Sequence, residues 1–257
     1  KWNPSVIYKK VDFKTSHHRK KSRLSKKEVR KIKGILRRVL KKNLQQLNAD
    51  EIKYLKLSKA RNKKQLRDAI KNIRTQYGLR DNYYIGLKKS HRYLDYIKKV
   101  FKAHGLPKEL VFLPHVESSF NYRAYSKVGA AGIWQFMRST GRLYKMKINY
   151  VVDERRDPLI ATVAAAKLLK FNYSRIKAWP LAITAYNHGL RSMQRAVKKV
   201  KSKKISDIIE KYNGRRFGFA SKNFYATFIA TVEISQDPLK YFPSFKKPSK
   251  FTYSTLK

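Results

Sequence analysis

Hydrophobic residues recur at helical spacing along most of the chain, and each such run predicts an amphipathic helix. The first run follows Ser25-Lys26-Lys27-Glu28, which has the residue types of a helix-capping box, so we expect a helix to begin there. Its inward face comprises Val29, Ile32, Ile35, Leu36, Val39 and Leu40. Two further runs predict helices at about 62–76 and at about 90–104, with Gly105 just past the end of the latter.

The second half of the chain alternates helical runs with turn residues. Pro107 predicts the start of a helix over about 107–119, which Pro114 should kink. Further helices are expected at 133–142, at 159–173 after an Asp157 cap, from Pro180 to His188, and at 222–236 after a Ser221 cap. The last of these should bury Phe224, Phe228, Ile229 and Val232.

Strand signals are scarce, so the fold class that we predict is mostly α with at most a small β element. Residues 120–133, rich in Ser, Gly and Ala, indicate a loop, and 146–152 indicate at most a brief strand. Residues 1–24 are polar, basic and unperiodic, which is typical of an extended arm. The adjacent His17 and His18 have no carboxylate nearby, which favours a solvated segment over a metal site. We therefore expect no metal and no cofactor.

Composition indicates a globular protein of 257 residues, 42% of them hydrophobic. The absence of cysteine excludes disulfides and thiolate metal sites. No apolar run approaches the roughly 18–20 residues that a membrane span needs. The sequence starts with Lys1-Trp2-Asn3-Pro4 and shows no signal sequence, so we expect a processed product of an exported protein.

The net charge is extreme at +46, from 62 Lys and Arg against 16 Asp and Glu, and it is densest in the first hundred residues. Such a field attracts polyanions, among them nucleic acid, wall polymers and anionic lipid headgroups. Charge alone does not choose among these partners. The alternative is a lysine-rich background with no functional meaning.

Acidic residues are rare enough that one of them is conspicuous. Glu117 is the only carboxylate between Glu109 and Asp153, and it follows an apolar helical segment. Burial among apolar groups raises a carboxyl pKa, and such a group can act as a general acid near neutral pH. Nearby cations would oppose that shift, so the alternative is a helix-end glutamate paired with lysines.

Several ordered motifs carry a resemblance to a known family. They are Leu113-Pro114-His115-Val116-Glu117-Ser118-Ser119-Phe120, Ala124-Tyr125-Ser126, Gly129-Ala130-Ala131-Gly132-Ile133-Trp134-Gln135-Phe136-Met137, Ser139-Thr140-Gly141, Asp153-Glu154-Arg155-Arg156-Asp157-Pro158 and Ala185-Tyr186-Asn187. Over roughly 62–236 the chain resembles the family 1 lytic transglycosylases (SLT domain, glycoside hydrolase family 23), in particular their murein transglycosylase D group. The combination of these motifs in this order is more specific than any one of them.

The resemblance implies a goose-type, lysozyme-like helical domain that cleaves peptidoglycan. On the matching positions it implies Glu117 as the catalytic acid/base. It also implies substrate binding by Ser126, Gln135, Met137, Tyr186 and Asn187. Amide and hydroxyl groups suit sugar hydroxyls and acetamido groups, and Tyr and Met suit the faces of sugar rings. The alternatives are that Trp134, Phe136 and Met137 belong to the core, that Tyr186 only packs, and that Asn187 ends a helix.

The resemblance also implies a domain plan. We expect an arm at 1–24, an N-terminal helical region at 25–105 that packs on the catalytic domain, the SLT catalytic domain at 106–236, and an irregular tail at 237–257. The chain departs from the usual family pattern at Tyr122, at Arg138 and at His188-Gly189-Leu190. These departures leave Glu117 untouched but put the finer specificity in doubt.

The reaction that the resemblance implies is cleavage of the bond between N-acetylmuramic acid and N-acetylglucosamine with 1,6-anhydromuramyl ends. A lysozyme-type hydrolase is the nearest alternative, because Asp153, Glu154 or Asp157 could activate water. It could act on N-deacetylated peptidoglycan. The second alternative is a non-catalytic basic protein that binds wall or nucleic acid. We expect glycan strands as partner, electrostatic association with an anionic wall or membrane surface, no specific nucleic acid, a monomer, and a periplasmic or cell-envelope location.

Overall fold

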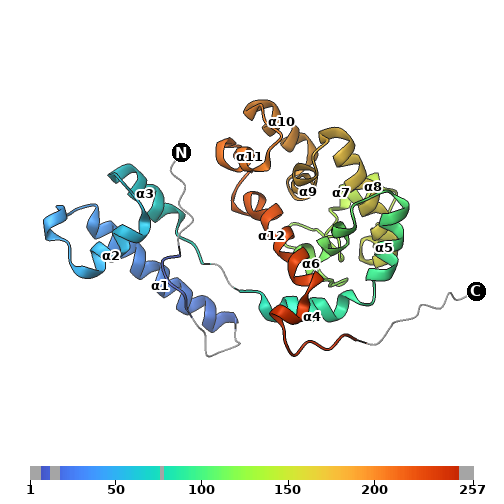
Figure 1. The fold of residues 1–257 in the computed structure, drawn as a ribbon, viewed down its shortest axis with the longest axis horizontal. Helices are drawn as coiled ribbons and strands as arrows, with labels where there is room; N and C mark the ends of the chain where they lie inside the picture. The colour runs from blue at the N-terminus through green and yellow to red at the C-terminus, as the bar shows by residue number, and fades with distance from the viewer. Residues whose placement is uncertain (1–6, 12–17, 76–77, 249–257) are drawn as a thin grey trace, which may run out of the picture. The chain divides into compact units, whose positions relative to one another are not determined.

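The computed structural model describes residues 7–11, 18–75 and 78–248, and the chain divides into two compact units, Lys1–Gly78 and Leu79–Lys257 (Figure 1). The described residues lie mostly in helices, which confirms the predicted fold class. Their β structure is confined to the isolated bridges Tyr125–Ala131, Ala131–Phe136 and Ile148–Asp153. Within the described ranges, no helix is long and apolar enough to cross a bilayer.

The first unit contains α1 (His18–Val39), η1 (Leu44–Gln46), α2 (Ala49–Ser58) and α3 (Lys63–Asn72). The predicted helix start at Ser25 is wrong, and so is the predicted arm over residues 18–24, because α1 begins seven residues earlier. Ser25 is buried inside the helix, and its hydroxyl donates to the Lys21 carbonyl at 2.8 Å, so it caps nothing. Residue 17 and the side chain of His18 lie outside the described part.

The core of the first unit comprises Ile32, Ile35, Leu36, Val39, Tyr54, Leu66 and Ile70. These include four of the residues predicted to face inward on the first helix. Helix α2 was not predicted, and it begins with a capping box of Asn48 and Glu51. Glu51 is fully buried between Lys42 (2.9 Å) and Arg38 (3.2 Å), a polar burial that an apolar periodicity does not reveal.

The second unit contains the remaining helices. They are α4 (Arg80–Ser90), α5 (Leu94–Ala103), η2 (Lys108–Phe112), α6 (Leu113–Ser118), α7 (Arg138–Leu143), η3 (Glu154–Arg156), α8 (Pro158–Ile176), α9 (Trp179–His188), α10 (Leu190–Val200), α11 (Ile205–Lys211), α12 (Phe219–Gln236) and α13 (Pro238–Tyr241). The predicted boundary at 105/106 is wrong, because α4 and α5 belong to this unit. Ile97 and Phe101 of α5 are buried in the same core as Trp134. The predicted packing of an N-terminal region on the catalytic domain stays a prediction.

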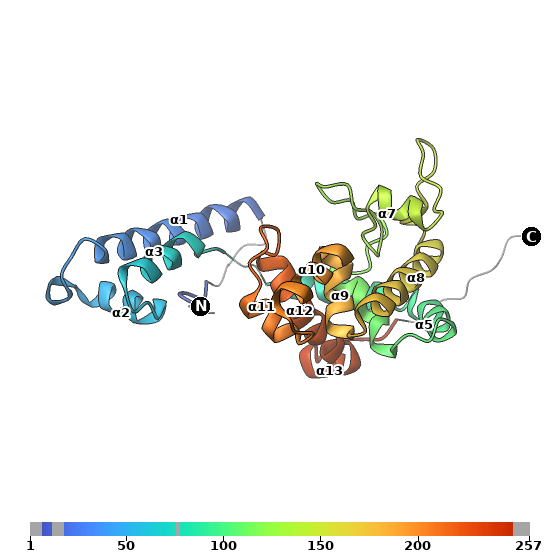
Figure 2. The ribbon, with the colours of Figure 1, turned by 90° about the horizontal axis from the view of Figure 1, so that it is seen from above.

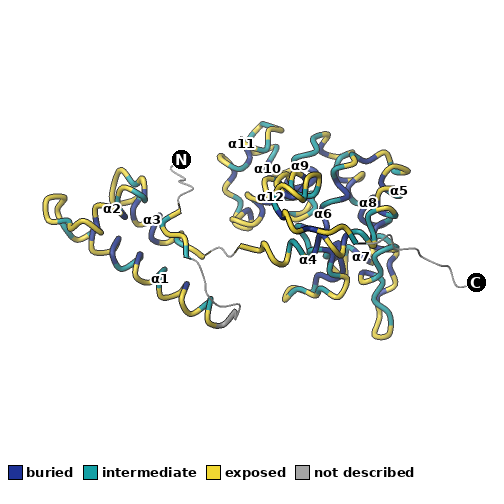
Figure 3. Tube along the Cα trace, turned by 60° about the horizontal axis from the view of Figure 1, so that its bottom comes forward, coloured by how far each residue is buried: buried dark blue, intermediate teal, exposed yellow. Residues whose placement is uncertain are grey.

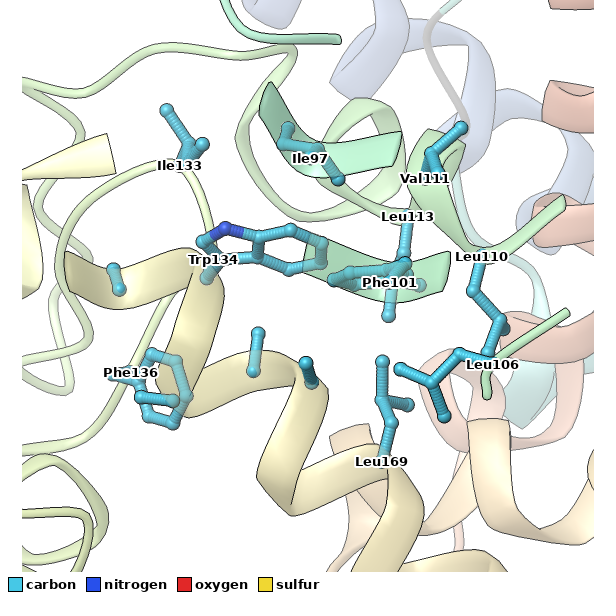
Figure 4. Close-up of a cluster of buried hydrophobic side chains, with 14 of the residues drawn as sticks. Ile97, Phe101, Leu106, Leu110, Val111, Leu113, Ile133, Trp134, Phe136 and Leu169 are labelled. Atoms are coloured by element: carbon cyan, nitrogen blue, oxygen red, sulfur yellow. The ribbon is translucent and has the colours of Figure 1, made fainter. Parts of the chain in front are cut away.

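Two main hydrophobic cores organise the second unit, and a minor third cluster joins α4 to the C-terminal segment. The larger one surrounds Trp134, which lies against Phe101 with Ile97, Leu113 and Leu169 close by (Figure 4). The smaller one joins α9, α10 and α11 through Leu181, Met193 and Ile208. The helices α4, α10 and α11 were not predicted. Buried and exposed positions alternate along most of these helices, as the colouring of Figure 3 shows.

Several predicted element limits differ from the observed ones. The segment predicted as one kinked helix consists of η2 and α6, and Pro114 lies in the first turn of α6, where a proline fits without a kink. The helix predicted at 133–142 starts only at Arg138, and 146–152 contributes a single bridge. α12 starts at Phe219, so Ser221 is inside it, and Ile229 is 46% exposed instead of buried.

The tail after α12 is more ordered than predicted up to residue 248. It forms α13, and Phe242 and Phe245 are buried against Leu87 of α4. Residues 249–257 lie outside the described part. Elsewhere in this unit, two loops flank α7 and extend away from the helices (Figure 2). Val128 in the first loop and Tyr150 in the second are strongly exposed.

Candidate active site

Glu117 lies in the last turn of α6, a helix of only six residues. The first three residues of this helix, Leu113, Pro114 and His115, are buried. Ser119 and Phe120 both have left-handed backbones, with φ of 52° and 55°, so the chain turns away immediately after the glutamate. Left-handed residues with side chains cost about 1–2 kcal/mol each, and the complete burial of Phe120 offsets that cost.

The carboxyl group of Glu117 is in an unusual electrostatic setting for so basic a chain. The residue is only partly exposed, and burial raises the pKa of its carboxyl to about 8. Among the described residues, no cation forms a salt bridge with it. Glu117 is therefore protonated at neutral pH and can donate a proton.

Near this carboxyl, two hydrogen bonds connect three motifs that are far apart in sequence: the one with Glu117 and Ser118, the one with Ile133 and Trp134, and the one with Tyr186. The hydroxyl of Ser118 donates to the Ile133 carbonyl at 2.9 Å, and the hydroxyl of Tyr186 donates to the Trp134 carbonyl at 2.8 Å. Burial raises the pKa of Tyr186 far above its usual value, and the charge of Glu117 contributes to that rise. Tyr186 and Ser118, the residue after Glu117, therefore bond to the carbonyls of two consecutive residues.

Trp134 supports this arrangement from within the hydrophobic core. This agrees with the alternative stated for Trp134 in the sequence analysis, that it is a core residue. Its side chain is fully buried, its ring stacks on Phe101 with centroids 5.4 Å apart, and its indole N–H donates to Thr162 at 2.9 Å (Figure 4). Phe136 is also buried. Both residues therefore fix the backbone from which Gln135 projects.

A buried arginine holds the loop that carries these residues. Arg155 is 0% exposed and forms a paired contact with the Asp153 carboxylate at 2.8 and 2.6 Å. Its remaining nitrogen donates to the carbonyls of Gly129 at 2.7 Å and Phe136 at 2.9 Å. Hydrogen bonds from Arg155 lower the pKa of Asp153. This ion pair therefore fixes both ends of the 129–136 segment.

Gly132 makes the close approach between this segment and Arg155 possible. Its φ is +79°, and a Cβ atom added there would lie 1.7 Å from the Arg155 carbonyl oxygen. No other residue type fits such a space. The glycine in this motif is therefore a structural requirement of the loop.

The predicted substrate-binding residues of the loop are at or near the surface. Ser126 accepts a hydrogen bond from the Ala130 amide at 2.9 Å within a tight turn. Gln135 has a left-handed φ of 49°, is half-buried, and donates to the Gly132 carbonyl at 2.9 Å. Met137 is 40% exposed, so it is not a core residue.

Asn187 and His188 end α9 and connect it to α12. Asn187 is exposed, and its side-chain oxygen accepts from the Ser221 hydroxyl at 3.2 Å. The same hydroxyl lies 3.1 Å from Nδ1 of His188, whose ring packs edge-on against Phe217. Asn187 thus ends a helix and also presents an exposed amide beside Tyr186.

Sequence reasoning missed Tyr144 and the role of Arg155. Tyr144 is half-buried, its ring centroid is 6.5 Å from that of Phe136, and its charge influences the pKa of Tyr186. No motif indicated Tyr144. Arg155 belongs to one of the family motifs, Asp153–Pro158. Only the fold shows that the arginine in this motif is buried.

The carboxylates that could assist Glu117 are all engaged elsewhere. Asp153 pairs with Arg155, Glu154 accepts from the Lys147 amide at 2.5 Å, and Asp157 caps α8 through the amides of Leu159 at 2.7 Å and Ile160 at 3.0 Å. The described residues also include no cluster of three His, Cys, Asp or Glu that could hold a metal ion. The site chemistry of the described residues therefore centres on one acid.

The second unit, which holds this site, is the part of the chain that matches a known family. Residues 95–209 match the model of the Transglycosylase SLT domain, the same family that the sequence motifs resemble.

Known proteins of this kind are similar to the chain. Membrane-bound lytic murein transglycosylase D of Escherichia coli (strain K12) is 36% identical over 139 residues, which cover 53% of this chain and 30% of that protein. The protein of the same name from E. coli O6:H1 (strain CFT073) gives the same values. The chain spans less than a third of the length of these relatives. Among solved structures, lytic transglycosylase Slt from Pseudomonas aeruginosa has a TM-score of 0.48 at 17% identity, covering 76% of this chain and 31% of that chain.

Proposed function

We propose that the second unit cleaves the glycan strands of peptidoglycan as a lytic transglycosylase, with Glu117 as its acid/base. The observation that carries the proposal is a lone carboxyl with a pKa of about 8 held beside Tyr186 by the SLT motifs. The substrate-binding role of Ser126, Gln135, Met137, Tyr186 and Asn187 is part of the proposal. Their exposed or half-buried hydroxyl, amide and thioether groups suit a polar polymer with apolar ring faces.

In the proposed reaction Glu117 supplies and recovers one proton. Its protonated carboxyl donates to the oxygen that links N-acetylmuramic acid to N-acetylglucosamine, and the bond from that oxygen to the muramyl C1 breaks. The resulting carboxylate accepts the proton of the muramyl C6 hydroxyl, whose oxygen closes a 1,6-anhydro ring on C1. Neither water nor a second carboxylate takes part, so one acid suffices.

The engagement of Asp153, Glu154 and Asp157 supports this route over hydrolysis. A hydrolase that inverts or retains uses a second carboxylate across the cleaved bond. Each of the three candidates already accepts hydrogen bonds that hold the fold together. If any of these carboxylates moved to activate water, the loop or the N-terminus of α8 would lose the hydrogen bonds that this carboxylate accepts.

The test is product analysis of digested sacculi by mass spectrometry. We expect 1,6-anhydromuramyl ends from the wild-type chain, and a loss of roughly 10²–10⁴-fold in rate for Glu117→Gln, the usual contribution of a general acid. Glu109→Gln, which removes the preceding acid of the chain, is the control and should retain activity. Reducing muramyl ends would instead indicate a hydrolase. Unchanged cleavage by Glu117→Gln would remove Glu117 from the mechanism.

We infer a cell-envelope location from the same chemistry. A glycan-strand substrate exists only in the wall, and the names of the similar E. coli proteins refer to murein and to membrane binding. The excess of 46 positive charges adds attraction to anionic wall polymers or lipid headgroups. Fractionation of cells that produce the protein checks this location, and recovery in the cytosolic fraction would contradict it.

A further inference from the structure

A cationic groove lies on α10, among residues that the proposed reaction does not use. Met193 and Ala196 bury one face of this helix completely. The opposite face carries exposed Arg191, Arg195 and Lys198, which fall on one side of the helix because they are spaced by four and three residues. With Gln194 they line an open hollow of about 370 Å³.

The cations of this groove are not neutralised by the protein. α10 contains no acidic residue, and no salt bridge of the described residues engages Arg191, Arg195 or Lys198. Among the residues that the structure describes, the hydrogen-bond partner of Arg195 is the hydroxyl of Ser192, to which it donates at 3.1 Å. Like charges one helical turn apart repel each other, and a bound anion relieves that repulsion. The groove is therefore suited to an anionic ligand.

The groove adjoins the end of α9 that carries Tyr186 and Asn187. Gly189 alone separates His188 from α10. Arg195 lies five residues after Leu190, the first residue of α10, which is about 7.5 Å along the helix axis. A polymer that contacts Asn187 can therefore also reach Arg195, whose charge contributes to lowering the pKa of His188.

We propose that this groove binds the carboxylates of the peptides attached to the glycan strand. The proposal rests on the proposed function, because that function places peptidoglycan at Tyr186 and Asn187. Peptide stems carry carboxylates and are linked to the muramyl residues at which cleavage occurs. Two guanidinium groups one turn apart offer planar paired donors that match carboxylates. Since they face a hollow beside the site, a substituent of the bound strand fits better than a flat lipid surface.

Binding to the full chain carrying Glu117→Gln tests this without any cleavage. We expect the further changes Arg191→Gln and Arg195→Gln to weaken binding to peptide-bearing strands about tenfold, the loss of two partly exposed charge-assisted contacts. Binding to strands stripped of peptides by an amidase should change less than twofold. Because no turnover is measured, failure of the wild-type chain to cleave contradicts only the proposed function.

A matched control removes the same charge elsewhere. Lys167→Gln with Lys170→Gln alters two exposed lysines of α8 and should leave both kinds of binding within twofold. An equal loss in this control, or an equal loss of the arginine variant on stripped strands, would show a general charge effect and overturn the proposal. So would an arginine variant that loses binding to phosphatidylglycerol vesicles but keeps it to peptide-bearing strands.

Discussion

Glu51 is fully buried and Glu117 is partly buried, and the pKa values of these two glutamates move in opposite directions. Hydrogen bonds from Lys42, the Asn48 amide and Arg38 lower the pKa of Glu51. Burial with no such partner raises the pKa of Glu117 to about 8. In a chain with 62 basic residues, the fold has to hold lysine and arginine side chains away from the Glu117 carboxyl for its pKa to stay raised. Glu51 is therefore a structural anion and Glu117 a candidate acid.

The pKa of Glu117 predicts the pH dependence of the reaction. The group must be protonated to act as acid, and a carboxyl with a pKa of about 8 is protonated below that pH and loses its proton above it. We therefore expect kcat/KM to fall about tenfold per pH unit above pH 8. Rates of muropeptide release from pH 5 to pH 10 check this. A decline that starts near pH 5, the range of an unperturbed glutamate, would contradict the raised pKa.

At the scale of elements, the site depends on the segment 129–136 and its attachment to Arg155. The buried arginine bonds to carbonyls at both ends of that segment, while Tyr186 bonds to the Trp134 carbonyl within it. A buried ion pair that loses one partner costs about 3–5 kcal/mol. The geometry around Glu117 is therefore coupled to residues that never meet a substrate.

Gly132 in this loop and Gly105 after α5 separate the cost of backbone strain from the cost of steric contact. Gly132→Ala combines a φ of +79° with a Cβ only 1.7 Å from the Arg155 carbonyl oxygen, so we expect a loss of more than about 3 kcal/mol in unfolding free energy and of activity. Gly105→Ala has a φ of +67° but no atom within 4 Å, so it should cost only about 1–2 kcal/mol. Urea unfolding measures both. If the two variants lost the same unfolding free energy, the contact with the Arg155 carbonyl would not contribute to the cost of Gly132→Ala.

At the scale of the whole molecule, charge and chemistry are divided unequally between the two units. Residues Lys1–Gly78 hold 26 of the 62 basic residues and only 5 of the 16 acids, yet the SLT match lies entirely in the second unit. Exposed cations such as Lys27, Arg30 and Lys31 lie along α1. The first unit therefore has the composition of an electrostatic binding element with its own core.

This division predicts how wall binding depends on salt. We expect the full chain to bind sacculi more tightly than residues 79–257 at low salt, and the difference to vanish as salt rises from about 0.05 M to about 0.5 M, because ions screen exposed charges. Sedimentation with sacculi measures this. Residues 79–257, which have their own cores, should keep their cleavage rate on soluble strands. A salt-independent difference would point to specific contacts instead.

Six helices, among them the long helices α1, α8 and α12, and the identity of the candidate acid could be predicted from the sequence alone. Apolar periodicity is a local property, so α1, α3, α5, α8, α9 and α12 follow from it to within a few residues, apart from the early start of α1. Glu117 stood out because acids are rare around it and because ordered motifs surround it. The helices α2, α4, α10, α11 and α13 were missed, since short helices rich in polar residues give a weak apolar signal.

The tertiary structure determined the contacts between residues that are far apart in sequence, which hydrophobic periodicity does not predict. Whether Glu117 meets a cation, whether Arg155 is buried, and whether Asp153 is free to act depend on contacts between residues far apart in sequence. The same holds for the unit boundary, which lies at Gly78 because α5 shares a core with Trp134. Sequence determined which residue types are present and which helices they favour. Only the packing of those helices set the electrostatic environment in which Glu117 holds its proton.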